Sequence, residues 1–318
     1  MNKSTKPLTK HVQDFLDYCE VEKGLSATTA RNYRRFLQKF FVWLKKNDLA
    51  ELLPKHLTEI HIWKYRMWLS RLPNQTRKAA SGLHTSTQTR YLIALRALLG
   101  YFHEKDIPSL PTEKIKLPKD RRERQVKFLN LDQLEALLTS PDAKSITGLR
   151  DRAILETLFS TGLRVAELIA LERKHLVGSQ DKDDFEMSIV GKGNYPRTVY
   201  FSGRTLHWIH KYLAARDDHD QALFVRFKGP NSDSFRLGIR GVESLVQKYA
   251  KISGISILAT PHTLRHSFAT DLLNNGVDIR MVQEFLGHRN IGTTQVYTHV
   301  TSKRLRDIHR EFHGGNKL

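Results

Sequence analysis

The 318-residue chain lacks several features that would place it in a common class of protein. Cys19 is the only cysteine, so no disulfide can form within the chain, and a reducing cytoplasm is the expected compartment. No run of about 18 apolar residues is present, so membrane insertion is not expected. The first residues, MNKSTKPLTKHV, contain no apolar stretch, so a signal peptide is not expected either. The sequence therefore predicts a globular cytoplasmic protein.

Nucleotide and metal sites also lack support in the sequence. The segment GKGN is not followed by the lysine and hydroxyl residue of a P-loop. Asp and Glu residues do not gather among the catalytic candidates as a two-metal nucleotidyl transferase requires. His262 and His266 have the i, i+4 spacing of zinc ligands, but Arg265 lies between them and would repel a cation. No metal and no cofactor are expected.

Negative charge is scarce relative to positive charge. The chain has 52 Lys and Arg residues against 33 Asp and Glu, a net charge of +19. The excess is concentrated in residues 1–127, which hold 26 basic and 12 acidic side chains. Because each contact between a basic group and a phosphate releases a counterion, a polyanionic partner is expected. A generic solubilising surface is the alternative.

Apolar periodicity predicts four helices in the first part of the chain. They are expected near residues 9–22, after a cap at Ser26, after a cap at Thr58, and near residues 86–103. The aromatic residues of these helices, Trp63 among them, are expected in the core, and the basic faces are expected to contact DNA. The arginines expected at the DNA are Arg31, Arg34, Arg35, Arg90, Arg121 and Arg122.

Three prolines and a charged run divide the chain into two domains. Residues 108–127 contain Pro108, Pro111 and Pro118 and end in KDRRERQVK, which predicts a basic linker between a helical domain at 1–107 and a second domain at 128–318. This linker could follow DNA phosphates or be an ordinary solvated connection.

The second domain is expected to be mostly helical with one β-hairpin. FEMSIV and RTVYF alternate apolar and polar side chains on either side of a turn, within residues 185–201. Lys192 lies in this turn between two glycines, which allow the backbone to approach a ligand. A solvent-exposed lysine without a function is the alternative.

Two pairs of residues in this domain are suited to bind an anion. Arg164 and Glu167 follow Gly162 at i, i+3 spacing, which predicts one helix face; an exposed ion pair of little energetic value is the alternative. His262 and Arg265 fall in the first turn of a helix that begins at Thr260-Pro261, where backbone N–H groups favour an anion.

A further histidine and a tyrosine complete the set. His288 stands in a Leu-Gly-His-Arg turn, and Tyr297 follows nine residues later. Together with the preceding pairs, they can hold a phosphodiester and attack it with the tyrosine oxygen.

These motifs resemble those of the tyrosine recombinases, the family of phage integrases and Xer-type recombinases. The matching segments are STGLRVAELIAL, the hairpin GKG, HTLRHSFAT and LGHRNIGTTQVYTH, and the chain is most similar to the Xer type. The resemblance implies a mainly α fold. A helical, SAM-like core-binding domain would precede a mixed α/β catalytic domain of mostly helices with a small antiparallel sheet.

The resemblance also implies a role for each catalytic residue. Tyr297 would be the nucleophile, forming a 3′-phosphotyrosyl bond and freeing a 5′-OH. Lys192 would protonate the leaving oxygen, His262 would assist proton transfer at the tyrosine, and Glu167 would orient the site. Arg164, Arg265 and His288 would bind the nonbridging phosphate oxygens. Because the covalent intermediate conserves bond energy, neither metal nor ATP is needed.

The function implied is site-specific recombination that resolves chromosome or plasmid multimers, linked to chromosome partition and cell division. The partners implied are a double-stranded recombination site and a tetramer formed with itself or a paralogue; an activating ATPase is left open. An apolar stripe near the C-terminus would dock on a neighbouring protomer or cover its own domain: Leu305, Ile308 and Phe312. The alternatives are an integrase of a mobile element, a DNA-binding protein without catalysis, and a relaxase similar to type IB topoisomerases.

Overall fold

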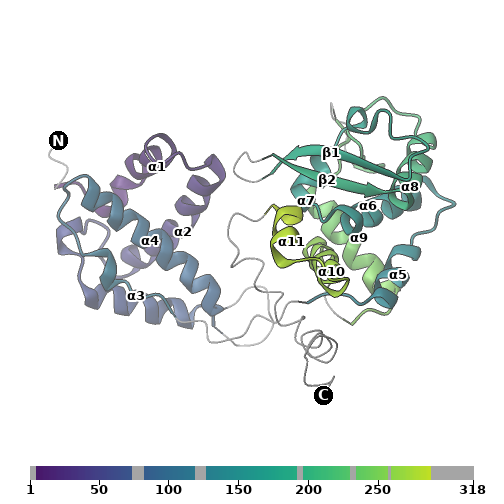
Figure 1. Ribbon diagram of the computed structural model, residues 1–318. Coiled ribbons are helices and arrows are strands. Elements are labelled where there is room, and N and C mark those ends of the chain that lie inside the picture. The colour runs from purple at the N-terminus through teal and green to yellow at the C-terminus, as the bar shows by residue number, and fades with distance from the viewer. Residues whose placement is uncertain are drawn as a thin grey trace, which may run out of the picture. The chain divides into compact units, whose positions relative to one another are not determined.

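The computed structural model describes residues 5–73, 82–118, 127–191, 196–229, 234–256 and 259–287. The chain divides into two compact units, Met1–Glu123 and Arg124–Leu318 (Figure 1). Helices predominate, and the described strands form one small antiparallel sheet, so the predicted fold class is confirmed. No described helix combines the length and apolar character that crossing a bilayer requires.

The first unit is a helical bundle with an aromatic core. Ser26 begins its second helix by accepting a hydrogen bond from the Thr29 amide, and Thr58 begins the third, as predicted. Phe15, Phe40 and Phe102 are fully buried in the core. Its elements are η2 (Leu8–His11), α1 (Val12–Val21), α2 (Ala27–Lys46), η3 (Pro54–His56), α3 (Glu59–Arg71), α4 (Thr85–Glu104) and η4 (Thr112–Lys114).

One aromatic residue of this unit does not lie where its sequence pattern predicted. Trp63 on α3 is 58% exposed, whereas Tyr65 on the same helix is completely buried. The two side chains lie about 200° apart around a helix of 3.6 residues per turn, so only one of them can face the core. The expectation that Trp63 belongs to the core is wrong.

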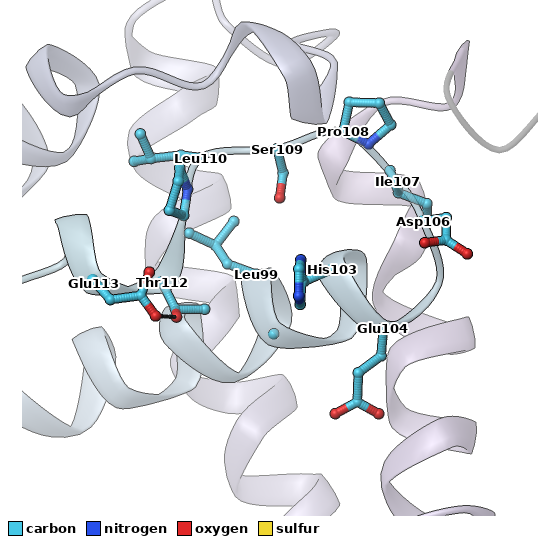
Figure 2. Close-up of a pocket in the computed structure, with 12 residues that line it drawn as sticks. Leu99, His103, Glu104, Asp106, Ile107, Pro108, Ser109, Leu110, Thr112 and Glu113 are labelled. Carbon is cyan, nitrogen blue, oxygen red and sulfur yellow. Dashed lines mark hydrogen bonds between the residues drawn. The ribbon is translucent and has the colours of Figure 1, made fainter.

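Part of the predicted linker packs on the first unit. Ile115 is buried in the aromatic core, and Leu110 and Leu117 pack against it. A hollow of about 510 Å³ separates this segment from the end of α4, and Figure 2 shows His103 and Ser109 pointing into it. No residue predicted for catalysis lines the hollow. The domain boundaries proposed from the sequence stay a prediction.

The second unit surrounds a buried helix, α6. Most side chains of α6 are buried, and the polar ones are paired: Arg152 with Glu156, and Asp151 with both Arg150 and the Tyr249 hydroxyl. The elements of this unit are α5 (Leu131–Thr139), α6 (Ile146–Thr161), α7 (Val165–Ala170), η5 (Arg173–Leu176), β1 (Asp184–Val190), β2 (Pro196–Ser202), α8 (Gly203–Ala214), α9 (Ile239–Ile252), α10 (Pro261–Asn274) and α11 (Ile279–Leu286).

The predicted hairpin brings a strand against the helices that carry the site. Strand β1 pairs antiparallel with β2 in a register that runs from Asp184↔Ser202 to Val190↔Pro196. Strand β2 contacts both α6 and α11, and α11 packs beside α10 (Figure 1). Residues far apart in the sequence therefore meet around β2, the start of α7 and the end of α11.

Candidate active site

The link between α6 and α7 positions Arg164. Gly162 ends α6 in the left-handed conformation, with φ of 58°, which glycine adopts without strain. Arg164 is the cap residue before α7, so the expectation that it shares a helix face with Glu167 is wrong in that respect. Glu167 instead accepts two hydrogen bonds from Arg164. The Arg164 amide donates to Glu167 Oε2 at 2.8 Å, and the guanidinium donates to Oε1 at 2.9 Å.

Glu167 has a second arginine partner, Arg197 on β2. Its Nη1 and Nη2 donate to Glu167 Oε1 and Oε2 at 2.9 and 2.8 Å. The Glu167 side chain is 9% exposed and that of Arg164 24%, so the alternative of an exposed ion pair between these two residues is wrong. The Arg197 side chain is 8% exposed. Burial raises the pKa of Glu167, but the hydrogen bonds from Arg197 and Arg164 outweigh it and lower the pKa to about 2. Glu167 is therefore a carboxylate at neutral pH.

Helix α10 supplies His262 from its first turn, as predicted, and Arg265 from the start of its second turn. Thr260 caps the helix by accepting a hydrogen bond from the Thr263 amide at 3.2 Å, and Pro261 occupies the first turn. Arg265 is 4% exposed, and its two Nη atoms donate to the carbonyl oxygens of Gly162 and Leu286. Arg265 thus joins the end of α6 to the end of α11.

The last turn of α11 is held by three arginines. Arg197 Nε donates to the Phe285 carbonyl at 3.2 Å, Arg265 donates to that of Leu286, and Arg164 Nη2 donates to that of Gly287 at 3.2 Å. The carbonyl end of a helix carries partial negative charge, which favours cations there. Three consecutive carbonyls therefore gather these guanidinium groups directly before His288 in the sequence.

Both histidines of α10 have lowered pKa values. Partial burial and the positive charges of Arg265 and Arg164 lower the pKa of His262, against a smaller opposite effect of Glu243. Burial, His262 and Arg265 lower that of His266 to about 4. Both rings are therefore mainly neutral at neutral pH, and His262, which is exposed, can accept a proton.

The structure brings together four of the predicted site residues. Arg164 and Glu167 are joined by hydrogen bonds, and Arg164 and Arg265 bind the adjacent carbonyls of Gly287 and Leu286. His262 lies close enough to both arginines for their charges to lower its pKa. Arg31, Arg34, Arg35 and Arg90 are exposed on α2 and α4 of the first unit. The remaining predictions lie outside the described residues: Lys192, His288, Tyr297, Arg121, Arg122 and the C-terminal stripe Leu305, Ile308 and Phe312.

Sequence reasoning missed Arg197. A usable signal was present, because residues 197, 199 and 201 lie on one face of a strand with a period of two. Val199 and Phe201 are buried on this face, which makes Arg197 a charged residue in an inward-facing position. Such a residue needs a buried partner of opposite charge, and Glu167 is that partner.

The low pKa of Glu167 predicts a loss of stability in acid. Its folded pKa of about 2 lies below the ordinary value, so this stabilisation is complete at neutral pH and is lost as pH falls from about 5 towards 2. We expect the free energy of unfolding of the wild type to exceed that of Glu167→Gln by a margin that shrinks by up to about 3 kcal/mol over this range. Urea unfolding of both proteins at a series of pH values measures the margin, and a constant margin would contradict the prediction.

No three His, Cys, Asp or Glu side chains of the described part of the chain gather as a metal site requires. The chemistry of the site rests instead on cationic donors. Two guanidinium groups, those of Arg164 and Arg197, pair with the single carboxylate of Glu167, and a third, that of Arg265, binds main-chain carbonyls beside them. The cluster therefore has a net charge of two positive, which suits it to an anion.

The sequence matches two domains of a known protein family. Residues 127–304 match the phage integrase family, and residues 12–105 match the phage integrase N-terminal SAM-like domain. The tyrosine recombinase XerD of Listeria monocytogenes is 36% identical, over 95% of this chain and 98% of that protein. The tyrosine recombinase XerC of Pelotomaculum thermopropionicum is 35% identical, over 95% of this chain and 97% of that protein.

A solved structure shares the fold at lower identity. The crystal structure of the XerH site-specific recombinase bound to a palindromic difH substrate, in a post-cleavage complex, superposes with a TM-score of 0.71. It is 22% identical, over 94% of this chain and 84% of that one. The chain therefore belongs to the phage integrase family of tyrosine recombinases, enzymes that exchange DNA strands, and is similar to the Xer proteins over nearly its whole length.

Proposed function

We propose that this tyrosine recombinase cuts and rejoins double-stranded DNA through a covalent bond between Tyr297 and a 3′-phosphate. The observation that supports this proposal best is the gathering of Arg164, Glu167 and Arg265 around the last turn of α11, directly before His288 in the sequence. A buried cationic site of this kind can hold one phosphodiester in a fixed orientation.

The scissile phosphate is bound by Arg164, Arg265 and His288. Negative charge develops on the nonbridging oxygens as the phosphorus becomes five-coordinate, and fixed donors stabilise it without having to reorganise. The carbonyls of Leu286 and Gly287 orient the two arginines before DNA arrives. Glu167 holds Arg164 at the start of α7, so its role is positioning.

Two residues transfer protons in the reaction, His262 and Lys192. Tyr297 forms a bond to phosphorus while its phenolic proton passes to His262, whose lowered pKa keeps it neutral and ready to accept. The bond from phosphorus to the 5′-oxygen breaks, and Lys192 donates a proton to that oxygen. Attack by a 5′-OH of a second strand reverses these steps and restores the tyrosine, which needs no external energy source.

The Xer role is favoured over integration of a mobile element because both Xer relatives match the chain over nearly their full length at about 35% identity. We propose that the protein resolves chromosome or plasmid multimers in the cytoplasm as a tetramer with itself or a paralogue. The chain is 36% identical to the XerD of Listeria monocytogenes and 35% identical to the XerC of Pelotomaculum thermopropionicum, and both types are candidates for the paralogue. A partner ATPase that activates the exchange is part of the same proposal.

A covalent adduct formed without metal tests the chemistry. Nicked duplexes that carry candidate recombination sites trap the enzyme, because the short cleaved 5′ strand diffuses away. In buffer with a metal chelator we expect a protein–DNA adduct whose protease-derived peptide contains Tyr297 linked to a 3′-phosphate. An adduct on the 5′-phosphate, or none on any site, would overturn the proposal.

Recombination between two sites separates the remaining alternatives. A circular DNA with two directly repeated copies of the cleaved site should resolve into two circles if the enzyme acts as a Xer recombinase. A mobile-element integrase would require two different sites, and a relaxase would remove supercoils from a circle with one site without exchange.

A further inference from the structure

We propose that Arg197 is a positioning residue of the active site: it fixes Glu167 and the last turn of α11, and thereby holds Arg164 against the scissile phosphate. The inference rests on the proposed function, because it takes from there the phosphate-binding role of Arg164.

Arg197 joins three elements with one side chain. From β2, it donates through both Nη atoms to the two carboxylate oxygens of Glu167 on α7, at 2.9 and 2.8 Å. Its Nε donates to the Phe285 carbonyl in the last turn of α11, at 3.2 Å. Only the planar fork of an arginine can satisfy a carboxylate with two parallel bonds while a third N–H points elsewhere.

The charges of the cluster show what this arrangement does for Arg164. Glu167 carries one negative charge and faces two guanidinium groups: Arg164 next to its own helix, and Arg197 from β2. Arg197 occupies both carboxylate oxygens and is almost completely buried, so it is the main counterion of Glu167. Two guanidinium groups against one carboxylate leave one positive charge in excess, and the Arg164 side chain, 24% exposed against 8% for Arg197, is the one that a phosphate can reach.

The main chain makes room for the Arg197 side chain at Gly287. This residue has φ of 61°, and a Cβ atom there would lie 2.7 Å from Arg197 Cδ. A side chain would therefore be strained by the backbone conformation and would displace Arg197. The glycine before His288 thus permits the close approach of α11 to β2 that the contact with Arg197 requires.

Stability alone gives no reason for an arginine at this position. Residues 199 and 201, on the same face of β2, are Val and Phe, and both are buried. A buried ion pair is often no more stabilising than well-packed apolar residues of similar volume. The ion pair between Arg197 and Glu167 instead fixes the position of the Glu167 carboxylate.

Single-turnover cleavage separates positioning from simple stabilisation. With Arg197→Ala, we expect adduct formation at saturating nicked duplex to fall about 10- to 100-fold, while DNA affinity changes less than about threefold. Arg197→Lys keeps the charge but loses the fork, so it should recover only part of the rate. Arg204→Gln is the matched control, because Arg204 donates to the buried Glu156 on α6 and touches no proposed site residue. It should cleave at the wild-type rate.

A double-mutant cycle supplies the second readout. If Arg197 acts through Glu167, the variant Glu167→Gln/Arg197→Gln should cleave no more slowly than the slower of the two single variants. The inference is overturned if folded Arg197→Ala and Arg197→Lys both cleave at the wild-type rate, or if the two single losses multiply. If the wild-type protein forms no adduct, the result contradicts the proposed function and not the role of Arg197.

Discussion

Tyr297→Phe is expected to abolish the covalent adduct on nicked DNA while DNA affinity stays within about threefold of the wild-type value. The substitution removes one oxygen atom and leaves the ring, so shape and packing change little. No bond to phosphorus can form without that oxygen. The measurement is denaturing gel electrophoresis of enzyme incubated with labelled duplex, together with an equilibrium binding titration.

Another tyrosine provides the control for this substitution. Tyr200 on β2 is 47% exposed, and its ring packs edge-on against Phe285 of α11. Tyr200→Phe removes the same atom from the same unit and should keep adduct formation at the wild-type level. An adduct that persists with Tyr297→Phe would show that a different side chain is the nucleophile.

Local rules predicted the helix starts and the hairpin from the sequence. Asn130 and Thr260 cap their helices through the amides of Gln133 and Thr263, as residues of this type do before an apolar run. The alternation on either side of GKGN likewise specified the pairing of β1 with β2. These features depend on neighbouring residues, which is why composition and spacing suffice to predict them.

The contacts that assemble the site depend on residues far apart in the chain. Arg265 donates to carbonyls 103 residues before it and 21 residues after it, and Arg197 donates to a carbonyl 88 residues away. Main-chain carbonyls have no sequence signature, because every residue has one. Periodicity can therefore place Arg197 on the inner face of β2 without indicating what it binds.

Arg265→Ala is expected to reduce adduct formation by about a thousandfold, because a charged donor to the transition state is lost. It should also destabilise the second unit. The carbonyls of Gly162 and Leu286 lose their shared buried donor, and each unsatisfied group costs about 1–3 kcal/mol. Arg265→Lys keeps the charge, but a single ammonium group cannot reproduce the planar fork that spans both carbonyls, so a loss of at least about tenfold should remain.

Arg216→Lys is a control that separates the effect of Arg265 on the reaction from its effect on stability. Arg216 is also buried and also clamps main-chain carbonyls, those of Ala222 and Leu223, at 2.8 and 2.9 Å. Arg216→Lys should lower the unfolding temperature about as much as Arg265→Lys does. It should leave the cleavage rate per folded molecule unchanged, because the partners of Arg216 belong to no catalytic element. Adduct formation and thermal unfolding are measured on both lysine variants to decide whether Arg265 acts on the phosphate or only stabilises the fold. If the two variants lose stability and activity in the same proportion, Arg265 is a structural clamp. If only Arg265→Lys loses rate, the residue acts on the phosphate itself.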